Sequence, residues 1–290
     1  MSNAVDIGKA LDITRCGEHD SCMSFDVRSA DLNAINTATK YPSIQTYHEL
    51  GERGALTEVV TQFTGPVIGT EKVDGSNARI ISLPDGNWLL GSREELLYAK
   101  GDLIGNPAQG IVAGLRSFAE SLEPVNDVVR VHYLELYGGK ITAASKQYTS
   151  ERAVGYRLFD IVELHDYDAI LTRSLSEISS WRESGGQPFL TEADLTAVAA
   201  RDRVELTPRL FEFDAAELPR DIESMREFLA EHLPVTRCRL DEGGAGKPEG
   251  IVLRTRNRSV IAKARVEDYE RTLRRRGRAA PAGAAVHGSR

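Results

Sequence analysis

The chain has 290 residues, of which 41% are hydrophobic and 27% charged, so it is long enough to bury one large core or two smaller ones. Its formal net charge of -7 argues weakly against a nucleic-acid partner for the chain as a whole. No apolar run approaches the roughly 18 residues of a membrane span, and the first twenty residues lack the pattern of a secretory signal. The three cysteines are too few for a disulfide framework and indicate a reducing cytoplasm.

Charge is distributed unevenly along the sequence. Residues 251–290 contain 11 Lys or Arg against 3 Asp or Glu, a local charge of +8, which leaves -15 on the remainder. Such asymmetry favours a polyanion as partner, and we expect Arg274, Arg275 and Arg276 to bind a nucleic-acid backbone. The alternative is a solvated tail, which the Ala, Gly and Pro content favours after residue 277.

The predicted elements begin with a polar, weakly periodic extension over residues 1–40, which is too short for an independent nucleic-acid-binding domain. Residues 66–83 predict two strands around a Gly-Ser-Asn turn. Asp85-Gly86-Asn87 predicts the next hairpin turn, with a third strand over 88–93. Apolar residues at helical spacing predict a helix over 110–122, and strands follow over 128–139 and 156–164.

Residues 165–235 are expected to turn helical, with segments over 170–183, 191–202 and 218–233. A glycine-rich stretch then leads to strands over 250–255 and 259–266 and to a helix over 267–276. Strands dominate both ends and helices the middle, so the sequence predicts an α+β class with antiparallel sheets flanked by helices. We expect one domain over 41–272, with a basic, disordered tail over 273–290.

Lys72 lies two residues before an Asp-Gly pair, between two apolar stretches. A single lysine on a strand is usually only a solvated charge, so this match proves little alone. Other charged and aromatic residues also lie at the ends of predicted strands, where a site built on sheets holds its ligands. They are Glu135, Phe159, Asp160, Glu249, Lys263 and Arg265.

The order EKVDGSN, GSR, ELYGG, FDIVE, PEGIVL and IAKAR resembles the six motifs of the covalent lysyl-nucleotidyltransferases, namely the ATP-dependent RNA ligases, DNA ligases and mRNA capping enzymes. Ser-Asn after Asp-Gly, the Gly-Ser-Arg strand and the trailing EDYERT are most similar to the phage-type RNA ligases that seal nicks in duplex RNA. The resemblance covers roughly residues 41–272 and implies a nucleotidyltransferase (ATP-grasp-like) ligase domain. It also implies ATP, Mg²⁺ or Mn²⁺, and a lysyl-AMP intermediate in joining an RNA 5′-phosphate to a 3′-hydroxyl.

The resemblance also implies a role for each matching residue. Lys72 is the nucleophile; since an amine attacks only when neutral and free lysine has a pKa of about 10.4, nearby cations should help. Lys263 and Arg265 are those cations and also contact phosphate. Asp74 and Glu249 are expected at the metal. The nucleotide is expected to contact Glu71 near adenine, Asn77, Arg93 at ribose or phosphate, Glu135 at the ribose hydroxyls, Phe159 stacked on adenine with Asp160 supporting it, and Lys263 and Arg265.

Two departures from the family pattern affect this interpretation. The last motif usually reads Lys-x-Lys, and Arg265 keeps the charge but cannot donate a proton, so the first step is expected to be slower. Only 25 residues follow Arg265, so the RNA-binding C-terminal domain of many relatives is expected to be missing, and a partner protein could supply RNA binding. An adenylyltransferase acting on a protein or small molecule and a non-catalytic RNA-end binder remain as alternatives. Cys16, His19 and Cys22, with Cys238, have the spacing of a rare zinc site.

Overall fold

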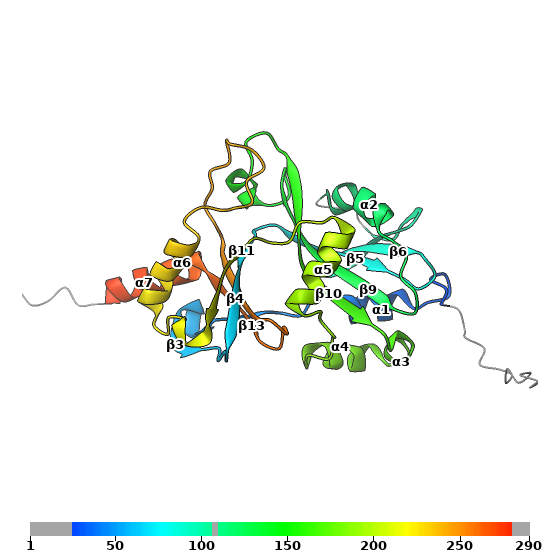
Figure 1. Cartoon of the computed structure of the whole chain (residues 1–290), viewed down its shortest axis with the longest axis horizontal. Coiled ribbons are helices and arrows are strands. Elements are labelled where there is room, and N and C mark those ends of the chain that lie inside the picture. The colour runs from blue at the N-terminus through cyan, green and yellow to red at the C-terminus, as the bar shows by residue number, and fades with distance from the viewer. Residues whose placement is uncertain (1–24, 106–109, 280–290) are drawn as a thin grey trace, which may run out of the picture.

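The protein is described here by a computed structural model that covers residues 25–105 and 110–279. Two main sheets lie side by side, with helices packed against each (Figure 1). The five-stranded sheet has the order β1 (Gln45–Thr46), β13 (Ile261–Arg265), β12 (Gly250–Thr255), β4 (Pro66–Lys72) and β11 (Arg209–Asp214). Its strands are antiparallel except for the parallel pair β1 and β13.

The six-stranded sheet is antiparallel and is covered on both faces. Successive side chains point to opposite faces of a strand, so Ile80 packs in a cluster with α2 (Ile111–Ser121) and α5 (Glu192–Asp202). Ile81 packs on the other side, in a cluster with α1 (Leu32–Thr39), α3 (Tyr167–Leu171) and α4 (Leu175–Glu183). The strand order is β10 (Val154–Leu164), β9 (Val129–Gly138), β5 (Ser76–Ser82), β6 (Trp88–Ser92), β7 (Leu96–Ala99) and β8 (Asp102–Leu103).

The five-stranded sheet has its own core, formed with α6 (Ile222–His232) and α7 (Val266–Ala279). Met225 and Leu229 of α6 lie in one buried cluster with Ile251 of β12. Helix α6 is capped by Asp221, whose side chain accepts a hydrogen bond of 2.8 Å from the Ser224 amide and so satisfies one free donor of the first turn. The remaining elements are a two-stranded sheet of β2 (His48–Leu50) and β3 (Leu56–Val60), and the 3-10 turns η1 (Glu52–Gly54), η3 (Ala143–Gln147) and η4 (Ala215–Glu217).

The α+β class with antiparallel sheets is confirmed, and two local expectations are corrected. Strands β4 and β5 do not form a hairpin, because β4 belongs to the five-stranded sheet and β5 to the six-stranded one. The expectation that residues 165–235 are helical is wrong at β11, an edge strand paired with β4. The sequence held a signal for β11, since Phe211 and Phe213 alternate with acidic residues and their rings stack with centroids 4.7 Å apart.

Helix α1 lies within the stretch 1–40, which the sequence assigned to an extension, and Ile35 is buried in the second cluster of the six-stranded sheet. The last carbonyls of a helix have no hydrogen-bond donor within the helix, and in α1 buried side chains provide these donors. Tyr133 and Gln187 donate to three of these carbonyls, and two buried arginines donate to the others. Carbonyls 36–40 all receive hydrogen bonds, of 2.7 to 3.2 Å, from Arg79, Arg182, Gln187 and Tyr133.

The segment after α1, residues 40–46, runs from one sheet to the other. Tyr41 packs edge-on against Tyr133 and Phe159 of the six-stranded sheet, with ring centroids 4.9 and 5.0 Å away. Five residues later, Thr46 of β1 pairs with Lys263 of the five-stranded sheet. We call residues 40–46 the strap, because they connect both sheets at the site described below.

At the other end of the described chain, α7 continues past residue 273 to Ala279, so it includes the start of the stretch expected as a tail. Arg275 donates to the Arg53 carbonyl at 2.7 Å, and Arg276 forms ion pairs with Glu58 and Glu223. Residues 1–24 and 280–290 lie outside the described residues, and with them Cys16, His19 and Cys22; the Cys238 thiol is buried. Among the helices described, none is long and apolar enough to cross a membrane.

Candidate active site

A pocket of about 680 Å³ opens where the two sheets meet. Strands β4, β12 and β13 supply one wall, and β5, β9 and the residues after β6 supply the other, while the strap passes along one side. All but one of the residues predicted from the motifs line this pocket, the exception being Asp160. The predicted residues in the lining are Glu71, Lys72, Asp74, Asn77, Arg93, Glu135, Phe159, Glu249, Lys263 and Arg265.

Lys72 is the last residue of β4 and pairs in register with Gly250, the first residue of β12. This register places Lys72 beside Glu249, and the Lys72 Nζ lies 2.7 Å from the Glu249 Oε2. Gly250 permits the close packing, since a Cβ there would lie 2.1 Å from the Ala264 carbonyl oxygen. The lysine amine is therefore held at the pocket by an ion pair that is only partly exposed.

Glu135 lies on β9 opposite Asn77 of β5 and accepts a hydrogen bond of 3.0 Å from the Gly75 amide. Burial raises the pKa of Glu135 to about 7; the nearby Glu249 carboxylate adds to the rise, and Lys72 opposes it. The pKa of Glu249 is also raised, chiefly by burial and against the attraction of Lys72. Two carboxyl groups with raised pKa values thus lie near the lysine. Such perturbed carboxyl groups are typical of functional sites, and a bound cation or metal ion would favour their ionised form.

Lys263 and Arg265 are two residues apart on β13, so their side chains lie on the same face of the strand and both line the pocket. Burial lowers the pKa of Lys263, and the positive charges of Arg265, Lys72 and Arg93 lower it further. Arg265 is fixed by two hydrogen bonds to the buried Asp268, at 2.7 and 3.1 Å. Lys263 and Arg265 thus place two cationic groups side by side at the pocket, where they are suited to bind an anion such as a phosphate.

The turn that joins β4 to β5 after Lys72 is held by a residue that belongs to neither strand. The Asp74 amide donates to the Tyr148 hydroxyl at 2.6 Å. The Asn77 Oδ1 is buried and has no hydrogen-bond partner among the described residues, so this acceptor is open to a ligand's donor. No group of three or more His, Cys, Asp or Glu among the described residues is arranged to hold a metal by itself.

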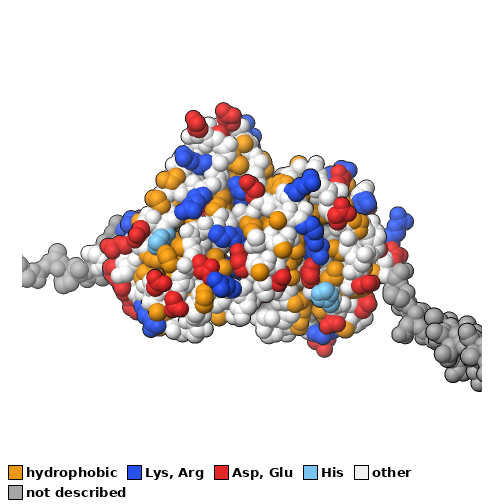
Figure 2. Space-filling view, in the orientation of Figure 1, with side chains coloured by type: hydrophobic (Ala, Val, Ile, Leu, Met, Phe, Trp, Pro, Cys, Tyr) orange, Lys and Arg blue, Asp and Glu red, His pale blue; other side chains and the backbone are white. Residues whose placement is uncertain are grey.

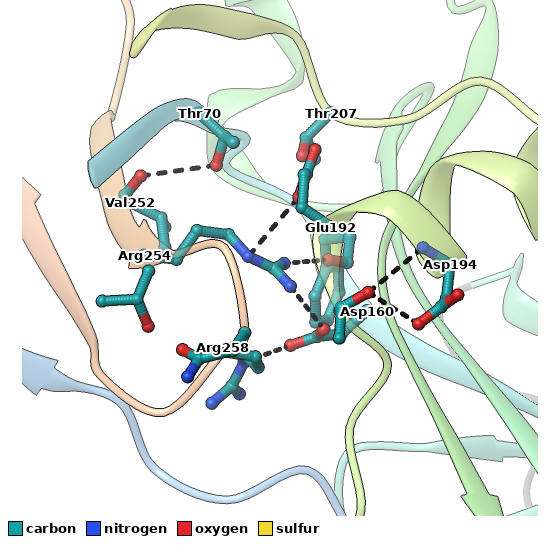
Figure 3. Close-up of polar contacts among 12 residues, drawn as sticks. Thr70, Asp160, Glu192, Asp194, Thr207, Val252, Arg254 and Arg258 are labelled. Carbon is teal, nitrogen blue, oxygen red and sulfur yellow. Dashed lines mark hydrogen bonds and ion pairs between the residues drawn. The ribbon is translucent and has the colours of Figure 1, made fainter. Parts of the chain in front are cut away.

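Asp160 lies beneath the pocket in a buried network shown in Figure 3. Its carboxylate pairs with Arg254 of β12 at 3.2 Å and with Arg258 at 2.7 Å, and accepts a hydrogen bond of 2.8 Å from the Tyr41 hydroxyl. Arg254 also donates to the Phe159 carbonyl at 3.0 Å. The network therefore fixes the backbone that carries Phe159, and it ties β10, β12 and the strap together.

Two predicted residues have side chains that are already engaged. The Glu71 carboxylate accepts hydrogen bonds from the Thr236 hydroxyl and, at 2.8 Å, from the Arg237 amide. Arg93 is half exposed and donates to the Ser43 hydroxyl of the strap at 3.1 Å.

Sequence reasoning missed three residues of the site: Arg254, Tyr41 and Tyr148. For Arg254 a signal existed, because it follows Val252 at the period of two that places both on the pocket face. For Tyr41 and Tyr148 there was none, since each reaches the site from a loop whose path depends on tertiary contacts.

Comparisons with known proteins give three findings. No curated protein matches the sequence significantly. Among solved structures, an RNA ligase of Naegleria gruberi, determined as a mutant with ATP and Mn, is 14% identical with a TM-score of 0.48, and the match covers 81% of this chain and 62% of that one. An archaeal ATP-dependent RNA ligase is 16% identical with a TM-score of 0.47, over 79% of this chain and 49% of that one. The chain thus spans less than two thirds of either protein.

The third finding is a match to a family model described as RNA ligase, which covers residues 65–265. These 201 residues are more than two thirds of the sequence and include Lys72 and all six of the motifs named above, so the chain belongs to the RNA ligase family.

Proposed function

We propose that this protein is an ATP-dependent RNA ligase that joins a 5′-phosphate to a 3′-hydroxyl through lysyl-AMP at Lys72. The main support for the proposal is the ion pair of Lys72 and Glu249, 2.7 Å apart where the end of β4 meets the start of β12. The pocket around this pair also contains Lys263 and Arg265. Family membership supplies the reaction class, and the pocket supplies a nucleophile with cations beside it.

In the first step the Lys72 Nζ attacks the α-phosphorus of ATP, a P–N bond forms, and the bond to pyrophosphate breaks. The amine must first lose its proton to solvent, because only the neutral amine is a nucleophile. Lys263 and Arg265 stabilise the negative charge that develops on the phosphate. An oxygen of the RNA 5′-phosphate then attacks the phosphorus of the lysyl-AMP, so a P–O bond forms and the P–N bond to Lys72 breaks. A 3′-hydroxyl finally attacks the RNA 5′-phosphate and expels AMP.

The remaining residues bind the nucleotide. Glu135, when ionised, accepts hydrogen bonds from the ribose hydroxyls. Phe159 offers its ring to the adenine, and the Asp160–Arg254 network holds it in place. Asp74 and Glu249 would hold Mg²⁺ or Mn²⁺ together with ATP, because Mg²⁺ takes one or two carboxylates plus phosphate oxygens and water. When bound, such an ion neutralises phosphate charge.

The test is covalent labelling with ATP that carries its label on the α-phosphate, in the presence of Mg²⁺. We expect the wild-type protein and a Lys100→Ala control, at an exposed lysine, to become labelled and Lys72→Ala to stay unlabelled. The labelled protein is then given nicked RNA with a 5′-phosphate, and sealing is followed on a denaturing gel. Labelling of Lys72→Ala would contradict the assignment of the nucleophile, and labelling without sealing would favour an adenylyltransferase. A cytoplasmic role in RNA repair, alone or with a partner protein, remains part of the same proposal.

A further inference from the structure

Beside Lys72 a rigid projection rises from the molecule, built from residues 139–153 and 235–248, which we call the ledge (Figure 1). Its two segments are bonded to each other through their backbones. The Leu240 amide donates to the Tyr148 carbonyl at 2.7 Å, and the Ala245 and Gly246 amides donate to carbonyls 146 and 147 at 2.9 Å. The Asp241 carboxylate also accepts from the amides of Ser150 and Glu151, so the ledge is one body rather than two free loops.

The ledge is attached to the reactive lysine at three points. Tyr148 accepts a hydrogen bond from the Asp74 amide, two residues after Lys72. The Arg237 amide donates to the Glu71 carboxylate, one residue before Lys72. The second segment then ends next to Glu249, which pairs with Lys72 itself. A ligand bound on the ledge is therefore held in a fixed position relative to the lysine.

The ledge carries an excess of exposed positive charge. Lys140, Lys146, Arg152 and Arg239 are exposed, and none of the four forms an ion pair with a described residue. Figure 2 shows this side of the molecule, with acidic side chains at the tip of the projection and Lys and Arg side chains below them toward the junction of the sheets. The carboxylate of Asp241, one of the ledge's acids, accepts the amide hydrogen bonds that join the two segments.

The basic helix α7 offers no comparable surface. Arg271 donates to the Gly54 carbonyl and pairs with Asp268, and Arg276 pairs with two carboxylates. Arg275 donates to the Arg53 carbonyl. These side chains attach α7 to the neighbouring turn η1, to β3 and to α6, so they are less free to bind a phosphate than the unpaired cations of the ledge.

We propose that the ledge binds the phosphodiester backbone of the RNA substrate beside the join, through Lys140, Lys146 and Arg239. The inference rests on the proposed function and adds the place where the RNA lies. Contacts from Lys and Arg to phosphates position a strand without reading its sequence, so the ledge binds RNA of any sequence. Binding of this kind weakens steeply with salt, because each neutralised phosphate releases counterions.

The test replaces three ledge cations at once, Lys140→Ala/Lys146→Ala/Arg239→Ala. Arg152 is left unchanged because its backbone is left-handed, with φ 63°, and a substitution there would alter the turn as well as the charge. The matched control, Arg28→Ala/Lys100→Ala/Arg173→Ala, removes the same charge from exposed positions outside the ledge. Both variants are assayed for lysyl-AMP formation and for binding of nicked, 5′-phosphorylated RNA without ATP, between about 50 and 200 mM salt.

We expect both variants to form lysyl-AMP at the wild-type rate, because ATP needs only the pocket. In the ledge variant the slope of log Kd against log salt should fall by about 2 to 3, as expected for three lost phosphate contacts on a duplex, while the control keeps the wild-type slope. Equal affinity and slope in the two variants would overturn the assignment of the ledge. Failure of the wild-type protein to form lysyl-AMP would overturn the proposed function instead, so the two failures are distinguishable.

Discussion

The ionised form of Glu135 is expected to destabilise the folded protein when no nucleotide is bound. Its pKa in the folded state is raised from 4.5 to about 7, chiefly by burial. Each pH unit of such a rise corresponds to about 1.4 kcal/mol, so the ionised carboxylate costs the folded state about 3 kcal/mol. The sign follows from the direction of the rise: no cost is present below the unfolded pKa, the cost grows as pH increases from 4.5, and it is complete above 7.

The perturbation that reveals this cost is Glu135→Gln, which keeps an oxygen to accept the Gly75 amide hydrogen bond but removes the charge. Between pH 5 and pH 8 the free energy of unfolding of the wild-type protein should fall by about 2 to 3 kcal/mol relative to the variant. Any cost of burying the new amide is nearly the same at both pH values and cancels in this comparison. Nucleotide binding should weaken in the variant, since the ribose loses its charged acceptor.

The assay is urea unfolding of both proteins at pH 5 and pH 8 without nucleotide or metal. Glu231→Gln, at an exposed position, is the control and should follow the wild-type protein at both pH values. A difference between wild type and Glu135→Gln that changes by less than about 0.5 kcal/mol over this range would refute the reasoning, because it would mean that the carboxylate is solvated in the folded state.

Two further predictions concern the pocket and its support. Glu249→Ala and Lys263→Ala should each lower the rate of lysyl-AMP formation by about a hundredfold or more, roughly 3 kcal/mol, while circular dichroism shows a retained fold; a variant that labels like the wild type would contradict its role. Gln187→Leu should reduce the free energy of unfolding by about 1 to 3 kcal/mol, because the carbonyls of Ala38 and Lys40 lose their donor, and urea unfolding measures it. The same variant should bind ATP more weakly, because the strap directly follows these carbonyls. Unchanged stability and affinity would argue against a role of these hydrogen bonds in holding the end of α1.

Most of the elements could be predicted from the sequence because their signals are local. The helix over 111–121 follows from apolar spacing, and the hairpin between β5 and β6 follows from Asp85-Gly86-Asn87. The assignment of β4 and β5 to different sheets could not be predicted, because it depends on which strands arrive from elsewhere: β12 and β11 for one, β9 and β6 for the other. A turn sequence specifies a change of direction and not the partners of the strands that flank it.

The candidate site was predictable to the extent that its side chains sit at strand ends. Lys72 and Glu249 meet because antiparallel pairing brings the end of β4 beside the start of β12, whereas Glu135 lies within β9 of the other sheet and lines the same pocket. The order of motifs along the chain sufficed to identify all three. The place of Asp160 beneath the pocket, paired to Arg254 and Arg258, needed the structure, since these partners are more than ninety residues away in sequence.

The hydrogen bonds at the end of helix α1 show that the boundary of the family match differs from the boundary of the packed structure. The part of the chain that matches the family begins at residue 65, and the motifs suggest a start near Tyr41, yet α1, which lies before both, is packed in a buried cluster of the six-stranded sheet. A protein shortened to start at Tyr41 would keep every catalytic motif but would leave Arg79, which is fully buried, without the Asn36 groups that accept its hydrogen bonds. An unpaired buried cation is costly enough to unfold a marginally stable domain. The smallest folded version of this protein is therefore defined by the hydrogen-bond acceptors that its interior needs and not by the residues that line the pocket.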